Sequence, residues 1–337
     1  MMAAEPTRRR APRPGRRVHG ASAPHGGAGG YHVPVLVDEV ADLIADEPEV
    51  VVDATLGGGG HASSVLTSHP RIRVLGIDRD PEARVVAGER LAPFGDRARV
   101  VAGRFGELSA ILERESAFLA GSAVGAVLFD LGVSSHQLDA PDRGFSLRAD
   151  APLDMRMDAT QGATAAEFLE SVDEDTLVLL LRENGETRFA RVLARAIMRS
   201  RPQTTSELVA VVDRAVPPGA RRRGPSAVRV FQALRRAVNE EGAELVDGLR
   251  QALAALRIDG ALIVISYHSG EDRVVKDFIR EGVTGGCTCP PGLPCVCGAV
   301  PTLRVRSLRA IQAGPAEVAA NPRARSARLR VGWKVAA

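Results

Sequence analysis

The chain has 337 residues, of which 45% are hydrophobic and only 4% aromatic, so it can bury a large core built mainly of aliphatic side chains. Residues 1–30 carry six arginines and one acid, a net charge of +5, which leaves −2 on the rest of a chain whose total is +3. This excludes a uniformly basic nucleic-acid-binding body, so RNA affinity must come from local arginine clusters or from the tail.

Residues 1–30 are rich in Pro, Gly, Ala and Arg without apolar periodicity, which is typical of a disordered segment. A transit peptide is an alternative, but the prolines and glycines oppose its amphipathic helix and favour a flexible basic arm. The chain shows no secretory apolar core and no apolar run long enough to span a membrane. Its four cysteines all lie within residues 287–297, unlike a secreted disulfide framework, so we expect a cytosolic protein without a membrane partner.

Strands and helices alternate in the first part of the predicted fold. Helices are expected over 37–45, 63–68, 81–91 and 105–114, and strands over 50–54, 73–77, 99–102 and 125–131. This alternation predicts an α/β fold with a mostly parallel sheet that helices cover on both faces.

The pattern changes after residue 160, where only helical periodicity continues to residue 256. Thr164–Glu167 and Thr204–Glu207 fit capping boxes, and further helices are expected over 188–199 and 226–239. Strands resume over 261–266, with two closing strands near 302–309 and 327–335. The predicted organisation is a disordered tail (1–30), one α/β domain (31–140 and 257–337) and an inserted all-helical subdomain (141–256).

A glycine-rich loop follows the first strand, in the stretch Val50–Ala62, VVVDATLGGGGHA. Gly57, Gly59 and Ala62 fit the G-x-G-x-x-A spacing that lets a ligand approach the backbone at a helix N-terminus. Asp78 ends the next strand, 21 residues after Gly57, where a carboxylate can accept both hydroxyls of a ribose. The alternative is a tight strand–helix turn with a solvent-exposed aspartate, but the position of Asp78 favours a nucleotide-like ligand.

Two cofactor classes use this geometry, nicotinamide dinucleotides and S-adenosylmethionine. Asp53 lies just before the glycines, where a carboxylate can face a cationic ligand end such as an α-amino group. Asp130–Ser135 (DLGVSS) forms a polar loop at the ligand-binding edge of the sheet, and the closing strand pair suits a methyltransferase. These features favour S-adenosylmethionine. Phe105 then lines or stacks on the adenine site, unless it is an ordinary core side chain.

Eight ordered motifs carry a resemblance to a known family. They are DATLGGGGHA, GIDRDPEA, FDLGVSSHQLD, RGFS, PLDMRMD, NGETRFA, ISYHSGEDRVVK and NPRARSARLR. Together they resemble the bacterial 16S rRNA (cytosine-N4) methyltransferase family, from residue 32 to about residue 330. The chain departs from the usual pattern of that family at His136, Tyr267 and Gly270, where Pro, Phe and Leu are common.

The resemblance implies a class I S-adenosylmethionine-dependent methyltransferase whose helical insertion follows the fourth strand and recognises RNA. It implies methylation of N4 of a cytidine in the decoding region of 16S rRNA, with the small ribosomal subunit as partner. Another RNA or DNA is the alternative substrate, and an assembly factor without catalysis is a third hypothesis. The cofactor residues that it implies are Gly60, His61 and Ala62 at the methionine part, Asp78 at the ribose, Phe105 at the adenine, and Asp130 and Gln137.

The chemistry of cytosine indicates what else the site needs. The exocyclic amine is a poor nucleophile because its lone pair is delocalised into the ring, so an acceptor for one N–H and in-line positioning do most of the work. Asp130 and Ser134 or Ser135 are the candidates for this acceptor, and Asp130 can alternatively serve the cofactor. His268 lies at the same sheet edge, either as a catalytic side chain or as a structural histidine. Residues 143–158 form either a lid over the site or a solvated linker with packed methionines.

Clustered arginines are the candidates for contacts with RNA phosphates, against the alternative of solvated charged loops. They are Arg221, Arg222 and Arg223 and, near the C-terminus, Arg323, Arg325, Arg328 and Arg330. The pattern C-x-C…C-x-C, made by Cys287, Cys289, Cys295 and Cys297, either binds zinc or stays reduced in a flexible loop. Methyl transfer itself requires no metal. The sequence leaves the oligomeric state open, a homodimer included.

Overall fold

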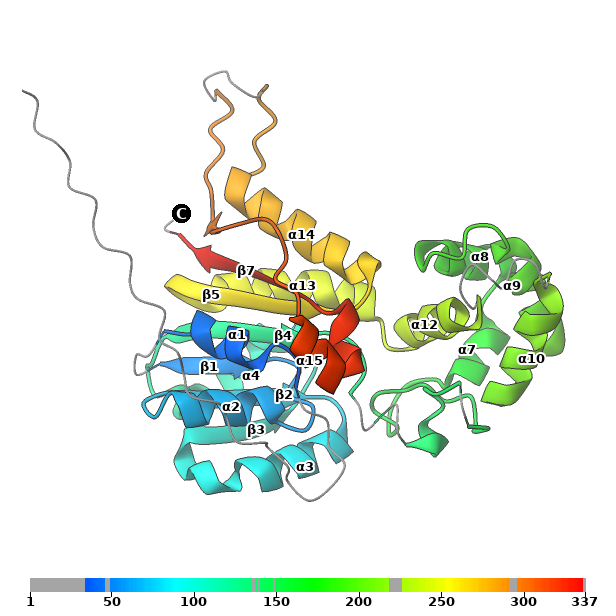
Figure 1. Ribbon diagram of the computed structural model, residues 1–337, viewed down its shortest axis with the longest axis horizontal. Coiled ribbons are helices and arrows are strands. Elements are labelled where there is room, and N and C mark those ends of the chain that lie inside the picture. Colours follow the sequence, from blue (N-terminus) through cyan, green and yellow to red (C-terminus); the bar gives the residue numbers. More distant parts are fainter. Residues whose placement is uncertain are drawn as a thin grey trace, which may run out of the picture. The chain divides into compact units, whose positions relative to one another are not determined.

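A seven-stranded sheet is the centre of the computed structural model, which describes residues 34–45, 49–134, 137, 140–147, 149–217, 226–290 and 296–335. The strand order is β3-β2-β1-β4-β5-β7-β6, in which β1 to β5 run parallel and β7 runs antiparallel to both of its neighbours (Figure 1). The basic tail of residues 1–30 lies outside the described residues. The strands are β1 (Val50–Asp53), β2 (Arg73–Asp78), β3 (Ala98–Ala102), β4 (Val124–Asp130), β5 (Leu256–Ser266), β6 (Leu303–Arg304) and β7 (Arg328–Lys334).

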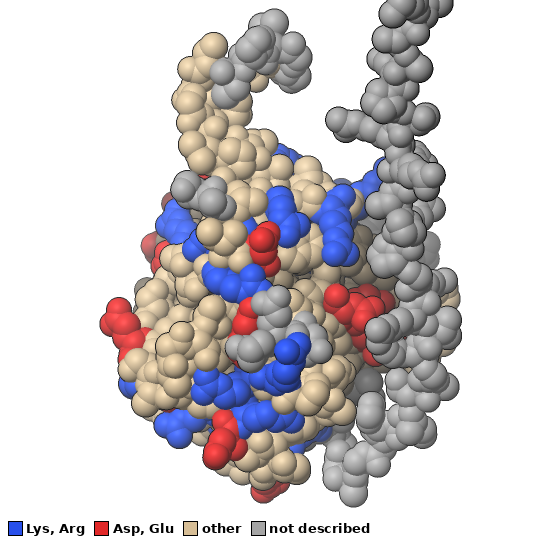
Figure 2. Space-filling view, turned by 90° about the vertical axis from the view of Figure 1, so that its left-hand side faces the viewer, with Lys and Arg blue, Asp and Glu red and all other residues tan. Residues whose placement is uncertain are grey.

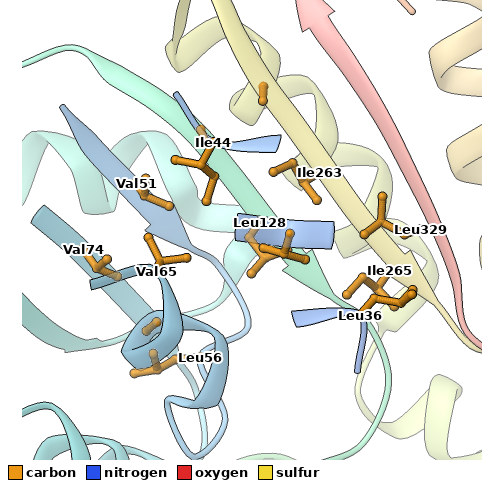
Figure 3. Close-up of a cluster of buried hydrophobic side chains, with 14 of the residues drawn as sticks. Leu36, Ile44, Val51, Leu56, Val65, Val74, Leu128, Ile263, Ile265 and Leu329 are labelled. Atoms are coloured by element: carbon orange, nitrogen blue, oxygen red, sulfur yellow. The ribbon is translucent and has the colours of Figure 1, made fainter. Parts of the chain in front are cut away.

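Helices cover both faces of the sheet, because successive strand residues point to opposite sides and are apolar on both. Val51, Leu128 and Ile263 pack on one face with α1, α2 and α3, as Figure 3 shows for part of this cluster. Val52, Phe129 and Val264 pack on the other face with α4, α13 and α14. The helices of this part are α1 (Val37–Leu43), α2 (Gly60–Ser68), α3 (Pro81–Leu91), α4 (Leu108–Arg114), α5 (Ser116–Leu119), α13 (Glu241–Ala255), α14 (Ser269–Thr284) and α15 (Pro315–Ala320).

The insertion after β4 is helical, as predicted, and has a hydrophobic core of its own. It ends before residue 256, the predicted boundary, because α13 packs on the sheet instead. Both predicted capping boxes are present. The side chains of Thr164 and Thr204 each accept the backbone N–H three residues later, and the side chains of Glu167 and Glu207 accept the backbone N–H of the capping threonine. The helices are α7 (Ala165–Ser171), α8 (Glu174–Glu183), α9 (Ala190–Ser200), α10 (Thr205–Ala215) and α12 (Ser226–Val238). No helix among the described residues is both long and apolar enough to cross a membrane.

Two predicted strands have different lengths in the structure. β5 begins at Leu256, five residues before the predicted start, because Leu256 pairs with Val124 and the register then shifts before Ala261 pairs with Ala126. This irregularity accommodates Asp259, whose φ is 62°, within the strand. β6 contains only Leu303 and Arg304 instead of residues 302–309, since only these two residues form its ladder with β7.

Candidate active site

A cavity of about 350 Å³ is lined by residues that follow the carboxyl ends of β1, β2, β4 and β5. Because these strands are parallel neighbours, their ends meet at one sheet edge, where open α/β sheets bind ligands. Of the predicted site residues, the wall contains Gly57, Gly60, His61, Asp78, Phe105, Asp130, Ser134, Gln137, His268 and Arg323. Asp53, Gly59, Ala62 and Arg325 are not part of this wall, and Ser135, Arg221, Arg222 and Arg223 lie outside the described residues.

The glycine loop has the conformation that its spacing predicts. Gly57 and Gly59 have φ angles of 51° and 73°, in the left-handed region that favours glycine. A Cβ on Gly59 would lie 3.3 Å from the Cβ of Ala87, and one on Gly60 would lie 3.0 Å from Cγ of Pro34. Gly57 and Gly60 therefore present bare backbone to the cavity, while Gly59 shapes the turn at the start of α2.

Asp78 holds the glycine loop from the neighbouring strand. Its Oδ2 accepts the N–H of Gly57 at 2.7 Å, and its Oδ1 accepts the N–H of Asp80 at 2.8 Å. Burial raises the pKa of Asp78, although both N–H groups oppose the shift. A carboxylate has about four acceptor positions, so further lone pairs remain for hydroxyl groups of a ligand in the cavity.

Asp80 and Arg143, neither of which was predicted, join the start of α3 to the start of the helical insertion. Asp80 is fully buried and caps α3 by accepting the N–H of Glu82 at 3.0 Å. Its Oδ2 also accepts from Nε2 of Gln137 at 2.8 Å and from Arg143 at 3.2 Å. The available signal was the Asp-Pro pair at the start of α3, which is typical of a helix N-cap.

The two methionines of residues 143–158 are at least partly buried. Met155 is fully buried in the core of the insertion, and Met157 lies on the cavity wall. Asn239, which follows α12, binds both: its side chain donates to the carbonyl of Met155 and accepts the N–H of Met157, each at 2.8 Å. The packing of the two methionines fits both alternatives, the lid and the linker with packed methionines.

Asp130 is the centre of a polar cluster at the end of β4. Its Oδ1 accepts the hydroxyl of Tyr267 at 2.8 Å, and its Oδ2 lies 3.6 Å from Nε2 of His61. Burial raises the pKa of Tyr267, and the Asp130 carboxylate raises it further, so the hydroxyl remains a donor. Burial disfavours the charged form of His61, but Asp130 and Asp53 outweigh it and raise the pKa of the imidazole. The Asp130 side chain keeps 25% of its surface exposed and faces the cavity.

Asp53 lies behind this cluster, which corrects its expected contact with a ligand. It is 2% exposed, is not part of the cavity wall, and its Oδ1 accepts the N–H of Thr55 at 3.3 Å. Asp130, at the end of β4, lies on the cavity wall instead. Ala62 is likewise absent from the wall, since its side chain points into the core that α2 shares with the sheet.

We expect Asp53 to make the stability of the protein depend on pH. Burial raises its pKa from 3.8 to about 7, against the opposing effect of His61. The unfolded chain therefore releases this proton at lower pH than the folded chain, so stability falls as pH rises from about 4 to about 7. His61, whose pKa is also raised, acts in the same direction. Asp53→Asn should flatten the fall of the melting temperature over this range.

The control for this prediction is Asp96→Asn, which changes an exposed aspartate of η1 (Ala92–Arg97). This variant should follow the wild-type pH profile. Equal slopes for Asp53→Asn and the wild type would show that Asp53 is already ionised in the folded protein at low pH.

Phe105 contributes both to the cavity and to the core. It begins η2 (Phe105–Glu107), and its ring meets the buried ring of Phe129 edge to face, with centroids 5.6 Å apart. A Cβ on Gly248 would lie 2.7 Å from Cδ2 of Phe105, so α13 holds the ring closely from one side. The half-buried remainder lies on the cavity wall. The two readings of Phe105 are therefore compatible.

A buried ionic cluster flanks this part of the cavity. Glu244 of α13, with 2% of its side chain exposed, pairs with Arg79 and, at 3.3 Å, with Arg104. Burial lowers the pKa of Arg79. Glu244 also accepts the N–H of Gly106 at 3.4 Å and so fixes the turn that carries Phe105. Nothing in the spacing of these residues, which are far apart in the chain, predicts this contact.

Comparison with known proteins identifies the family. The model of the MraW methylase family matches residues 30–335. The chain belongs to this family. Ribosomal RNA small subunit methyltransferase H of Geobacter sulfurreducens is 47% identical over 312 residues, which cover 90% of this chain and 99% of that protein. The protein of the same name from Nocardioides sp. is 49% identical over 314 residues, covering 90% and 96%.

Membership of the MraW methylase family confirms the resemblance and the prediction of a methyltransferase. It also decides between the two cofactor classes in favour of the methyl donor. The strand order, with an antiparallel β7 between β5 and β6, confirms the predicted class I methyltransferase sheet with an inserted helical part.

The remaining candidate catalytic residues of this MraW methylase, Ser134 and His268, make different contacts. Ser134 lies on the cavity wall, and its Oγ accepts the N–H of Gln137 at 3.2 Å. His268 caps α14: its Nδ1 accepts the N–H groups of Gly270 and Glu271 at 3.2 and 3.3 Å, and its Nε2 lies 2.5 Å from Glu271. Both ring nitrogens are thus engaged within the protein, which favours the structural reading of His268.

The arginines of the C-terminal motif also separate into two groups. Arg323 and Arg325 are exposed on η4 (Pro322–Ser326), and Arg323 lies on the cavity wall. Arg328 and Arg330 instead bind Asp272 at 3.1 and 2.7 Å. The side chain of Arg330 is only 10% exposed, which corrects its expected contact with RNA phosphates. On the face in Figure 2, arginines lie among acidic side chains rather than in one continuous basic surface.

The cysteine pattern of this MraW methylase lies between α14 and β6. Cys287, Cys289 and Cys297 are described and close together, and Cys295 lies outside the described residues. The backbone N–H of Val296 is the main cause of a lowered pKa at the Cys289 thiol. None of the three described cysteines lines the cavity.

Proposed function

We propose that this MraW methylase transfers a methyl group from S-adenosylmethionine to N4 of a cytidine in the 16S rRNA of the small ribosomal subunit. The observation that supports it most is the convergence of Asp78, Asp130 and the bare glycine backbone on one cavity at the end of a class I sheet. The names of the relatives, ribosomal RNA small subunit methyltransferase H, support the substrate class.

The cavity residues fit this cofactor. The volume of about 350 Å³ is within the range of small-molecule sites. Gly57 and Gly60 leave backbone uncovered, Asp78 offers acceptors for two hydroxyls, and the half-buried ring of Phe105 offers an apolar surface for adenine. When bound, S-adenosylmethionine supplies an electrophilic methyl group on a sulfonium. Gln137, held by Asp80, lines the same cavity.

The protein's contribution to the transfer is positioning and hydrogen bonding. Asp130 accepts one N–H of the target amine, which turns the nitrogen lone pair away from the carboxylate and strengthens the nucleophile. Tyr267 and His61 hold the carboxylate in place from two sides. Ser134 is the second acceptor candidate on the wall. The extra proton of the methylated nitrogen is acidic, so no strong base is needed.

Mass spectrometry of 16S rRNA nucleosides tests the proposed function. Small subunits from cells that lack the activity are incubated with the protein and methyl-labelled S-adenosylmethionine. The label should appear as N4-methylcytidine in 16S rRNA. Label in another nucleoside, or transfer only to another RNA or to DNA, would contradict the substrate assignment. Saturable binding of NADH without binding of S-adenosylhomocysteine would contradict the cofactor.

RNA binding is expected to depend on the cluster Arg221, Arg222 and Arg223. Changing all three to alanine should weaken rRNA binding. The slope of the logarithm of the binding constant against the logarithm of the salt concentration should become shallower by about one unit per lost phosphate contact. The affinity for S-adenosylhomocysteine should not change. Filter binding over a salt series and calorimetry measure the two quantities. A loss confined to cofactor affinity would show that this cluster serves the cofactor site.

A further inference from the structure

Three cysteine thiols lie together in the segment that connects α14 to β6. Cys287 and Cys289 follow the end of α14, and Cys297 lies on the returning arm of the segment. The Sγ atoms of all three lie within 4.8 Å of one another, and those of Cys287 and Cys297 are 3.6 Å apart. The proposed methyl transfer uses none of them.

The separation of the Cys287 and Cys297 sulfurs is close to that of two thiolates on a common metal ion, and the third sulfur lies within 4.8 Å of both. Zinc–sulfur bonds of about 2.3 Å in a tetrahedron place two ligand sulfurs about 3.8 Å apart. A disulfide joins two sulfurs at about 2.05 Å and leaves the third cysteine without a function. Soft thiolate donors select zinc over the hard cations that bind carboxylates.

The backbone of the segment is built to bring the two arms together. Gly286, just before Cys287, and Gly298, just after Cys297, have φ angles of 73° and 70°. No atom lies within 4 Å of a Cβ added at either glycine, so the backbone conformation rather than crowding requires them. At Gly285, in contrast, a Cβ would lie 2.5 Å from the backbone of Val300 on the other arm. The two arms are thus in direct contact beside the thiols.

Apolar burial does not account for this arrangement. Val296 is 90% exposed and Val300 is 56% exposed, so the described part of the segment lacks the apolar cover that orders other connections of this protein. A bound metal ion provides such order in small segments without a core. We propose that Cys287, Cys289 and Cys297 bind a zinc ion as a structural site that closes the segment between α14 and β6.

On binding, each thiol releases one proton to the solvent, and the resulting thiolate donates a lone pair to Zn²⁺ without any change of oxidation state. The three described cysteines supply three of the four ligands of a tetrahedral site. Cys295, in the same sequence pattern, lies outside the described residues.

Metal analysis of the full-length protein tests the proposal. The chain is produced with added zinc, kept reduced and passed through a desalting column, and its content of zinc, iron and copper is measured. We expect about one zinc per chain. Cys287→Ser and Cys289→Ser should lose most of it. Thr288→Ala and Val296→Ala, which change exposed neighbours of the ligands, should keep it.

Cobalt substitution tests the proposal on the wild-type protein, so its result does not depend on whether the serine variants fold. Replacement of zinc by Co²⁺ should give an intense near-ultraviolet sulfur-to-cobalt band and visible bands of tetrahedral cobalt. Absence of these bands, a reduced chain that takes up no zinc, or equal zinc contents in the serine variants and the wild type would overturn the proposal. So would a metal-free protein in which thiol titration finds a disulfide between Cys287 and Cys297.

Discussion

Asp130→Asn is expected to reduce methyl transfer by about 10²-fold or more, a size typical for the loss of a preorganised hydrogen-bonding group at a reacting centre. The amide keeps the shape of the side chain but replaces one acceptor oxygen with a donor. That donor faces the target amine or competes with the hydroxyl of Tyr267, which now donates to the carboxylate at 2.8 Å. Single-turnover kinetics with saturating cofactor measure the effect on transfer, and calorimetry with S-adenosylhomocysteine measures cofactor affinity.

Tyr267→Phe is the matched control, because it leaves the carboxylate of Asp130 in place and removes one hydrogen bond to it. We expect a loss of about tenfold, which corresponds to about 1.4 kcal/mol for a hydrogen bond to a charged group. The affinity for S-adenosylhomocysteine should change little in either variant. If Asp130→Asn weakened cofactor binding as strongly as it slowed transfer, the carboxylate would serve the cofactor rather than the amine.

Asp78→Ala is expected to weaken the binding of S-adenosylhomocysteine by about 10²-fold or more. Each hydrogen bond to a charged group contributes about 1.5–3 kcal/mol, and the variant loses the acceptor for two ribose hydroxyls. It also leaves the N–H groups of Gly57 and Asp80 without the carboxylate that now accepts them. The glycine loop therefore loses its anchor to β2. Isothermal titration calorimetry measures the dissociation constant directly.

Asp96→Ala serves as the control for Asp78→Ala, since Asp96 is an exposed aspartate of η1, which precedes β3. It should bind the cofactor product with wild-type affinity. Asp78→Asn should fall between the two, because the amide oxygen still accepts one hydrogen bond. Unchanged affinity in Asp78→Ala would mean that the cofactor ribose lies elsewhere in the cavity.

The order of elements and the sheet edge that carries the site could be predicted from local sequence. Apolar runs that end in Asp53, Asp78 and Asp130 indicated parallel strands with their carboxyl ends together, and the structure has them on β1, β2 and β4. The glycine spacing predicted the positive φ angles of Gly57 and Gly59. Both kinds of signal depend on neighbouring residues, which a single sequence contains.

Contacts between distant segments could not be predicted in this way. The pair formed by Glu244 and Arg79 depends on how α13 packs on the sheet, and the pair formed by Asp80 and Arg143 depends on the path of the chain after β4. The same limit explains why the sequence did not show which of Asp53 and Asp130 faces the cavity. Both end parallel strands, but only the depth of each side chain beneath the loop shows which one faces the cavity.

The side chain of Asp80 sets a limit on how this enzyme can be shortened. Its fully buried carboxylate is neutralised by Arg143, which belongs to the chain that leads into the helical insertion. Removing one member of a buried ion pair typically costs about 3–5 kcal/mol. A minimal enzyme that lacked the insertion from residue 141 to the end of α12 at Val238 would leave a negative charge uncompensated beneath the glycine loop. The insertion therefore cannot be removed without a further change. A catalytic domain without it would need a neutral residue at position 80 to remain folded.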